Sequence, residues 1–279
     1  MICMKTSLVT KALVKKYLPT RTKKSNKTHA GKLVIVAGSA GMYGAGILSA
    51  LAATRSGAGY TYLMMDWTNP QLLKHPDILF LRPKIELLKK IKATAYVLGP
   101  GLGISIKAKS NLNYFIKNKL ENVILDADGL TLLSKIKEPK IPSSWILTPH
   151  EGELARLLNI SSDEIRRSPS RYADLAQKKY GCTILLKGTI TYIADGEIIW
   201  KSKSGTPALA KAGTGDVLAG IIGGLLAQGL KPSLAAALGA YLHGLASKRF
   251  LRNGNDVISM RPLDLIESLP TIIKLSRSS

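Results

Sequence analysis

Residues 32–65 read KLVIVAGSAGMYGAGILSALAATRSGAGYTYLMM, and two hydrophobic patterns alternate within them. Residues 32–37 and 60–65 are short apolar runs with β-branched or aromatic side chains, which is typical of strands. Between them a glycine-rich loop at 38–44 leads into residues 45–56, whose small side chains allow a helix to pack closely on a sheet. The segment therefore predicts a strand, a helix and a second strand in succession.

The same alternation continues along the chain. We expect further strands at 95–98, 123–126, 145–148, 183–187, 190–194 and 197–201, and helices at 105–117, 129–134, 152–158, 171–180, 216–228, 233–250 and 262–274. Alternation at this spacing favours right-handed βαβ units, and hence an α/β fold with a central, mostly parallel sheet flanked by helices on both faces. The Asp195-Gly196 pair between two apolar runs predicts a hairpin.

Length and composition fit one large domain. The chain has 279 residues and is 46% hydrophobic, with only three Phe and three Trp, so the core must consist mainly of Ile, Leu, Val and Ala. No linker, repeat or change of composition divides it. We expect residues 1–279 to form a single domain, with residues 1–31 as a basic N-terminal helix and connector; the helix is expected over residues 1–19, where apolar residues recur at helical spacing.

The formal net charge of +22 is compatible with nucleic-acid binding or with an enzyme that attracts polyanionic small molecules. The basic residues are scattered along the chain, which favours a solvated basic surface and argues against a nucleic-acid partner. The longest strongly apolar stretch, residues 217–226, is about half of the roughly 20 residues that a membrane span needs. We therefore expect a cytoplasmic protein with no membrane partner.

The segment with the clearest chemical signature is GTPALAKAGTGDVLAG, residues 205–220. Gly213 and Gly215 flank Thr214, and an apolar helix begins at Asp216. A glycine turn that leads into a helix exposes backbone N–H groups at the positive end of the helix dipole, which together form an anion site. Asp216 can then be either a helix cap or a base beside a bound phosphate. The sequence leaves both interpretations open.

Gly213 to Asp216 resembles the G-x-G-D signature of the ribokinase-like superfamily, whose aspartate is the catalytic base and whose glycine amides form an anion hole. Five more segments follow in the order of one family: residues 38–59, GPGLG at 99–103, DAD at 126–128, TPHEGE at 148–153 and KGTIT at 187–191. Each alone has a simpler explanation as a turn or a cap. Together they make the chain, from about residue 31 to residue 251, similar to the ADP-dependent NAD(P)H-hydrate dehydratases.

The resemblance implies a ribokinase-like fold and a set of site residues. Asp216 would be the catalytic base, and the hydrated NADH or NADPH would also contact Ala45, Gly101, Gly103 and His150. The adenosine nucleotide would contact Lys187, Gly188, Thr189, Ile190, Thr191, Gly213, Thr214 and Gly215. ADP, or ATP, would be the co-substrate, and Mg²⁺ would bridge its oxygens without assigned protein ligands. We also expect a homo-oligomer, with a tetramer as one form.

The chain departs from the family pattern at three places. Glu151 follows His150 where the family usually has Pro, Lys211-Ala212 precedes the glycine turn, and the upstream Asn is missing. The carboxylate of Glu151 is therefore expected to point away from phosphate or toward a metal. His29, His75 and His243 receive no role.

Two alternatives remain at this stage. One is an ATP-dependent small-molecule kinase of the same superfamily, similar to hydroxyethylthiazole kinases, which would release a stable phosphoester. The other is a nucleic-acid-binding protein, although the chain lacks the usual signatures of that class.

Overall fold

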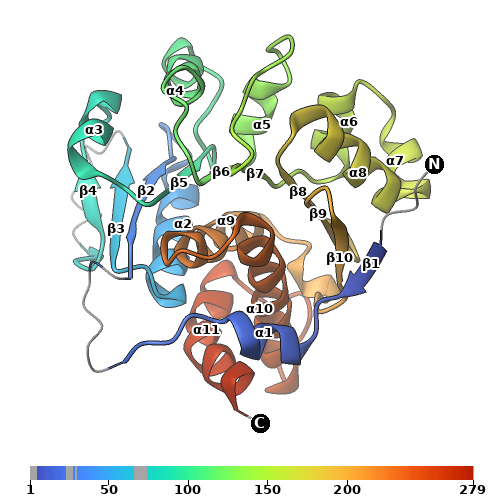
Figure 1. The fold of residues 1–279 in the computed structure, drawn as a ribbon. Helices are drawn as coiled ribbons and strands as arrows, with labels where there is room; N and C mark the ends of the chain where they lie inside the picture. Colours follow the sequence, from blue (N-terminus) through green and yellow to red (C-terminus); the bar gives the residue numbers. More distant parts are fainter. Residues whose placement is uncertain (1–4, 23–27, 29, 66–73, 279) are drawn as a thin grey trace.

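The computed structural model describes residues 5–22, 28, 30–65 and 74–278, and it has three layers, with one sheet between two layers of helices (Figure 1). The strands are β1 (Lys5–Leu8), β2 (Lys32–Val36), β3 (Tyr60–Met64), β4 (Leu79–Leu81), β5 (Ala95–Leu98), β6 (Val123–Leu125), β7 (Ile146–Leu147), β8 (Thr183–Leu186), β9 (Thr191–Ala194) and β10 (Ile198–Ser202). Their order in the sheet is β1-β10-β9-β8-β7-β6-β5-β2-β3-β4. Only β9, among these strands, runs antiparallel to its neighbours β8 and β10. The expected mostly parallel sheet is confirmed.

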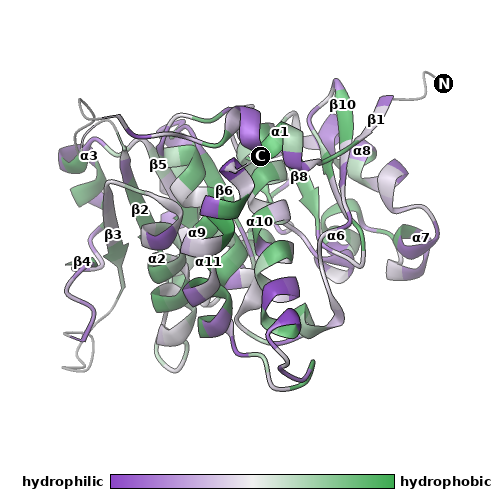
Figure 2. Ribbon diagram, turned by 90° about the horizontal axis from the view of Figure 1, so that it is seen from below, coloured by the Kyte–Doolittle hydropathy of each residue, from purple (hydrophilic) through white to green (hydrophobic). Residues whose placement is uncertain are grey.

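Helices cover both faces of the sheet. Below it in Figure 1 lie α1 (Lys11–Tyr17), α2 (Tyr43–Ser56), α9 (Thr214–Ala227), α10 (Pro232–Arg252) and α11 (Pro262–Arg277). Above it lie α3 (Leu88–Ile91), α4 (Ile106–Lys117), α5 (Asp128–Leu133), α6 (Glu151–Leu158), α7 (Ser162–Arg167) and α8 (Pro169–Tyr180). Short 3-10 turns occur at Ile85–Leu87 and Pro207–Leu209. Figure 2 shows green, hydrophobic segments of the lower helices and purple, hydrophilic ones along the same helices.

Two hydrophobic cores result, one on each face of the sheet. In β2, Leu33 and Ile35 belong to the core beneath α2 and α9, whereas Val34 and Val36 belong to the core beneath α4 and α5. Successive side chains of a strand point to opposite faces, and here both faces are buried. This explains why the strand reads as an uninterrupted apolar run.

Glycines bring α2 and α9 into close contact. A Cβ atom on Gly220 would lie 2.1 Å from the backbone oxygen of Ser49, and one on Gly224 would lie 2.2 Å from Ser56 Oγ. Any larger residue at these two positions would force the helices apart. The loops that precede the two helices are therefore held in a fixed relation to each other.

The order in which the chain adds strands to the sheet reverses between β2 and β5. From β2 the chain continues to β3 on one side, whereas β5 and then β6 lie on the other side. The loops that leave the carboxyl ends of β2 and β5 meet there, and the N–H of Gly38 donates to the carbonyl of Pro100 at 2.9 Å. In open α/β sheets, ligands bind at this kind of switch point.

The N-terminal expectation was wrong in part. Residues 5–8 form a strand, because β1 pairs in parallel with Ile198–Lys201 of β10 and extends the sheet edge. The helix begins only at Lys11, after Thr10, whose hydroxyl accepts a hydrogen bond from the N–H of Leu13 at 3.2 Å. Residues 1–4, 23–27 and 29, which include His29, lie outside the described part. The single domain over residues 1–279 stays a prediction.

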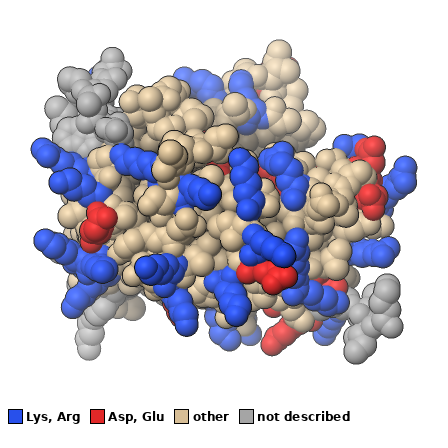
Figure 3. Space-filling model, turned by 90° about the horizontal axis from the view of Figure 1, so that it is seen from above, with Lys and Arg blue, Asp and Glu red and all other residues tan. Residues whose placement is uncertain are grey.

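Surface charge follows the scattered pattern of the sequence. Lys and Arg side chains are spread over the face seen in Figure 3, interrupted by a few acidic groups. No helix among the described residues has the length and apolar character that crossing a membrane requires.

Candidate active site

The first turn of α9 is an exposed array of backbone donors. Gly213 precedes it with φ of 91°, and a Cβ there would lie 2.7 Å from Pro262 Cγ, so the turn requires glycine. The N–H of Thr214 donates to the carbonyl of Lys211, and that of Val217 donates to Gly213. The N–H groups of Gly215 and Asp216 have no hydrogen-bond partner within the described residues. These two amides are the ones available to an anion.

The side chain of Asp216 does not cap this helix. The first turn of α9 has no side-chain cap hydrogen bond, and the carboxylate of Asp216 forms no hydrogen bond with the described part of the chain. Only its backbone carbonyl is used, as an acceptor from Ser49 Oγ at 2.9 Å. Of the two interpretations that the sequence left open, the cap is therefore wrong, and a carboxylate with free lone pairs remains.

The environment of Asp216 makes it a competent base near neutral pH. Its pKa is raised to about 7, mainly by burial and to a smaller extent by the negative charges of Asp126 and Asp128, while the charge of Lys187 opposes the rise. A general base is most effective when its pKa lies near the working pH. The carboxylate is therefore able both to hold and to release a proton under physiological conditions.

The ammonium group of Lys187 interacts with three carboxylates, those of Asp126, Glu153 and Asp216. Its Nζ lies 2.8 Å from Asp126 Oδ1 and 3.7 Å from Glu153 Oε2. Burial alone would lower the pKa of Lys187, but the charges of Asp126, Glu153 and Asp216 outweigh it, and the pKa is raised. Asp126 is buried and also accepts a hydrogen bond from Thr148 Oγ1 at 2.8 Å. Lys187 is thus a fixed ammonium group.

His150 precedes α6, and its ring is half exposed, with Nε2 3.6 Å from Glu153 Oε2. Its Nδ1 accepts from the N–H of Gly152 at 3.0 Å, and the carboxylate of Glu153 accepts from the N–H of His150 at 2.8 Å, which completes a capping box at α6. With Nδ1 as an acceptor, the neutral ring carries its proton on Nε2. Glu151 is paired with exposed Arg166 at 3.2 Å, which neutralises its charge.

A cavity of about 460 Å³ adjoins this turn. It is lined by seven of the predicted site residues, namely His150, Lys187, Gly188, Thr189, Thr191, Thr214 and Gly215. Ile190 and Gly213 are not among the lining residues; Gly213 instead shapes the turn. Polar groups from β8, α6 and α9 therefore converge on one hollow, as α/β enzymes arrange them at the carboxyl edge of a sheet.

The other predicted substrate residues lie together beside a second hollow. A Cβ on Gly101 would lie 2.9 Å from that of Ala45, and the N–H of Gly103 donates to Asp128 Oδ2 at 2.7 Å. The adjoining hollow of about 210 Å³ is lined by Ser39 and Tyr43, among others. Asp128 connects this side to Asp216, whose pKa it raises.

No role was expected for His243 from the sequence, yet it lines the 460 Å³ cavity. It is 7% exposed, its Nε2 has no hydrogen-bond partner among the described residues, and burial lowers its pKa to about 4, so the ring is neutral. His243 lies on the apolar helix α10, and the sequence pattern of such a helix does not distinguish a site residue from a core residue. Pro207, Leu209 and Leu218 add an apolar side to the same cavity.

Comparison with known proteins gives one consistent result. A family model described as NAD(P)H-hydrate dehydratase matches residues 33–271. The chain is 30% identical to the ADP-dependent (S)-NAD(P)H-hydrate dehydratase of Nitrosopumilus maritimus, over 95% of this chain and 96% of that protein. It is 37% identical to the bifunctional NAD(P)H-hydrate repair enzyme of Coxiella burnetii over 86% of this chain, and it spans about half (50%) of that longer protein. A crystal structure of the ADP/ATP-dependent NAD(P)H-hydrate dehydratase of Bacillus subtilis, co-crystallised with ATP/Mg²⁺, superposes with a TM-score of 0.88 at 29% identity, covering 99% of this chain and 100% of that one.

Proposed function

The chain belongs to the NAD(P)H-hydrate dehydratase family, and we propose that it catalyses the ADP-dependent dehydration of the S-epimer of hydrated NADH or NADPH. The products are AMP, phosphate and the restored dinucleotide. The observation that supports this reaction best is the carboxylate of Asp216, which forms no hydrogen bond with the described residues and whose pKa is raised to about 7. Such a group accepts a proton from a hydroxyl as that hydroxyl attacks phosphorus.

The proposed reaction has two stages. Asp216 takes the proton of the C6 hydroxyl while the hydroxyl oxygen forms a bond to the β-phosphorus of ADP, and the bond from that phosphorus to the bridging oxygen breaks to release AMP. The lone pair of the ring nitrogen then expels phosphate from C6, and loss of a proton from C5 restores the reduced nicotinamide. Phosphate leaves far more readily than hydroxide, and this is what the nucleotide contributes.

The free amides of the α9 turn suit the negative charge on the oxygens of the transferred phosphoryl group. The N–H groups of Gly215 and Asp216 are without partners in the described part of the chain, and they lie at the positive end of a helix dipole. Lys187 lines the same cavity, with its charge maintained by Asp126 and Glu153. We assign the phosphates of the nucleotide to this end of the cavity.

Other residues that line the cavity suit the adenosine portion. Thr189 and Thr191 offer hydroxyl groups, and Pro207, Leu209 and Leu218 offer apolar surface. The hydrated nicotinamide would lie toward Ala45 and Gly101, with His150 donating from Nε2. In this proposal the two substrates would meet at Asp216, which itself lines neither of the two hollows.

We also propose that Mg²⁺ binds to the protein together with the nucleotide. Within the described residues no group of three or more His, Cys, Asp or Glu side chains is suited to hold a metal ion, and Asp126 and Glu153 are engaged by Lys187. Mg²⁺ would therefore be held by phosphate oxygens and water, and it would neutralise part of the phosphate charge. We also retain the predictions of a cytoplasmic protein and a homo-oligomer such as a tetramer.

Incubation of the protein with chemically hydrated NADH and either ADP or ATP tests the proposal. Recovery of the absorbance of reduced nicotinamide, with one AMP or ADP and one phosphate for each NADH, is the expected result. A stable phosphorylated product without recovery of absorbance would instead indicate the small-molecule kinase of the same superfamily.

A further inference from the structure

A pocket of about 250 Å³ lies at the far ends of α2 and α9 from the candidate active site. Both helices begin at the site, and Ser56 at the end of α2 and Gln228 just after α9 line the pocket. Each helix has 14 residues and is therefore about 21 Å long. The pocket is thus separated from Asp216 by the full length of both helices.

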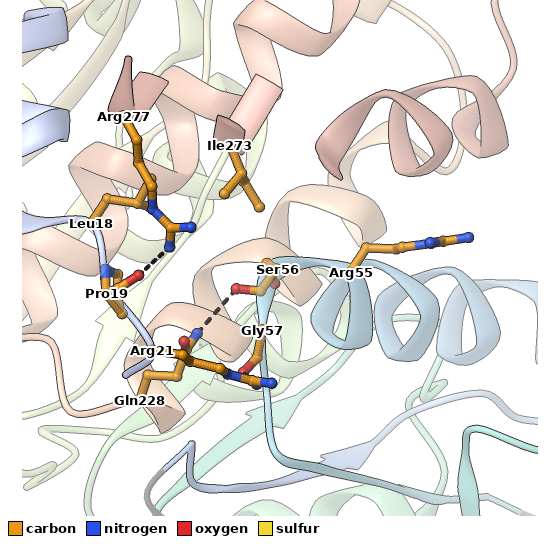
Figure 4. A pocket seen from close by; sticks show the side chains of 9 residues that line it. All are labelled: Leu18, Pro19, Arg21, Arg55, Ser56, Gly57, Gln228, Ile273 and Arg277. Carbon is orange, nitrogen blue, oxygen red and sulfur yellow. Dashed lines mark hydrogen bonds between the residues drawn. The ribbon is translucent and has the colours of Figure 1, made fainter. Parts of the chain in front are cut away.

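Three arginines from three different segments border this pocket. Arg21 comes from the N-terminal connector, Arg55 from the last turn of α2 and Arg277 from the last turn of α11. Figure 4 shows Arg21 and Arg277 approaching from opposite sides of Ser56, whereas Arg55 extends outward. No acidic residue lines the pocket, and none of the three arginines forms an ion pair with a described carboxylate. Exposed Arg166 and Arg261, in contrast, each pair with Asp or Glu.

Arginines at helix ends often serve only to satisfy backbone carbonyls. Here two of the three arginines do so, but each uses only one of its donors for a carbonyl. Gln228 Nε2 donates to the carbonyl of Ser56 at 3.0 Å, and a nitrogen of Arg21 donates to the carbonyl of Gly57 at 2.8 Å. Arg277 donates to the carbonyl of Pro19, which belongs to no helix. Arg55 donates no hydrogen bond within the described residues. Most guanidinium donors therefore remain available.

We propose that this pocket binds the phosphate group of a small phosphorylated molecule. Guanidinium groups match phosphate oxygens with parallel hydrogen bonds, and a phosphate dianion compensates more than one of these charges, unlike a single carboxylate. Leu18 and Ile273 supply an apolar wall for a short organic group. The volume of 250 Å³, against 460 Å³ for the nucleotide cavity, favours a small phosphomonoester over a dinucleotide. The inference is independent of the proposed reaction.

A site-resolved titration tests the proposal. The Nε–Hε signals of Arg21, Arg55 and Arg277 are assigned in ¹⁵N NMR spectra from the single Arg→Gln variants, and the parent is titrated with inorganic phosphate at constant ionic strength set by chloride. The expected result is a saturable shift of the Arg21 and Arg277 signals, because these two guanidinium groups approach the pocket. Arg156 is the internal control, because it is also an exposed arginine in the last turn of a helix but lines none of these pockets. Equal shifts at Arg156, or shifts produced equally by chloride, would overturn the proposal.

Calorimetry with glycerol 3-phosphate measures the strength of the site. The R21Q/R277Q variant should bind at least about tenfold more weakly than the parent, since each lost charge-assisted hydrogen bond is worth a factor of this order, whereas R156Q should bind as the parent does. If the double variant does not fold, the single variants R21Q and R277Q decide the matter, because each removes one of the two guanidinium groups that approach the pocket and keeps the other. Unchanged affinity in both single variants, or binding only to phosphatidylglycerol vesicles and not to the small phosphomonoester, would contradict a small-molecule site.

Discussion

Lys187 Nζ lies 2.8 Å from Asp126 Oδ1, and the same ammonium group also interacts electrostatically with Glu153 and Asp216. One cation is therefore shared among three carboxylates. Because Asp126 takes the hydrogen bond, Lys187 stabilises the charge of Asp216 only in part, and burial keeps the pKa of Asp216 raised to about 7. The Lys187–Asp126 pair thereby influences the proton affinity of the proposed base.

The pH dependence of turnover should follow Asp216. Its deprotonated form is the active one, so kcat/KM should rise about tenfold per pH unit below about 7 and level off above it. The measurement is the initial rate with hydrated NADH and ADP between pH 5 and pH 9. A profile that stays flat across this range would exclude Asp216 as the titrating base.

Two substitutions should move this midpoint in opposite directions. Asp126→Asn removes a charge that raises the pKa of Asp216 and frees Lys187 to pair with it, so the midpoint should fall. Lys187→Met removes the opposing cation, so the midpoint should rise. Asp163→Asn, which changes an exposed carboxylate paired with Arg166, is the control and should leave the midpoint in place. The quantity to compare is the pH midpoint of kcat/KM and not its absolute value, because Lys187→Met is also expected to weaken nucleotide binding.

The layers of the fold were predictable from the sequence because the buried strands carry their own signal. The run at residues 32–37 is apolar on both faces, and β2 is covered by helices on both sides. The strand at residues 5–8 could not be recognised, because it reads KTSL and is defined only by its pairing with β10 at the other end of the sequence. Likewise β4 and α7 are short, and their local sequences are not clearly different from those of turns.

The site was predictable only where a motif carries the chemistry. The glycine turn and Asp216 follow from their order in the chain, but the choice between cap and base required the hydrogen bonds of α9. The role of Asp126 depends on Lys187, which is 61 residues away in the sequence. His243 lies on an apolar helix and becomes a wall of the cavity only through tertiary packing.

Nucleotide affinity should depend on the space at Gly188. This residue lines the 460 Å³ cavity, and a Cβ added to it would meet only the carbonyl of Ile190 at 3.4 Å, so a larger side chain fits the fold and extends into the cavity. Gly188→Val should weaken ADP binding at least about tenfold while hydrated NADH binds as before. Calorimetry with each ligand separates the two effects. Unchanged ADP affinity would place the nucleotide elsewhere.

The α2–α9 contact should be sensitive to a single methyl group. Gly220→Ala places a Cβ 2.1 Å from the carbonyl oxygen of Ser49, and the resulting displacement should lower the free energy of unfolding by about 1–3 kcal/mol. Gly44→Ala is the matched control, because nothing lies within 4 Å of its added Cβ and its φ is not positive. Urea denaturation should show a loss for the first variant and none for the second. Equal stability of the two variants would mean that the helices adjust freely.

Asp216 should also make stability depend on pH. Its pKa is raised from 3.8 to about 7 on folding, so the folded state holds the proton more tightly than the unfolded state does. The stability that comes from this proton is present below about pH 4 and is lost as the pH rises through about 7. Asp216→Asn has no such loss, so its advantage over the parent in urea denaturation should grow between pH 5 and pH 8. An advantage that is constant over this range would mean that the carboxyl group titrates normally in the folded protein.

The activity of Asp216→Asn separates the proposed base from a purely structural residue. Asn keeps the shape of the side chain but cannot take the proton, and loss of a general base typically costs about 10²- to 10⁴-fold in rate. Affinity for ADP should persist or increase, because a negative charge beside the phosphates has been removed, and the free amides of Gly215 and residue 216 are unchanged. The expected variant is therefore folded, binds ADP in calorimetry and restores almost no NADH from the hydrate.

Asp264→Asn, at the corresponding position in the first turn of α11, is the control for a carboxylate that does cap a helix: it should lose stability but retain turnover. Turnover of Asp216→Asn within a few-fold of the parent would refute the mechanism, because the other described carboxylates in this site, Asp126, Asp128 and Glu153, all accept hydrogen bonds.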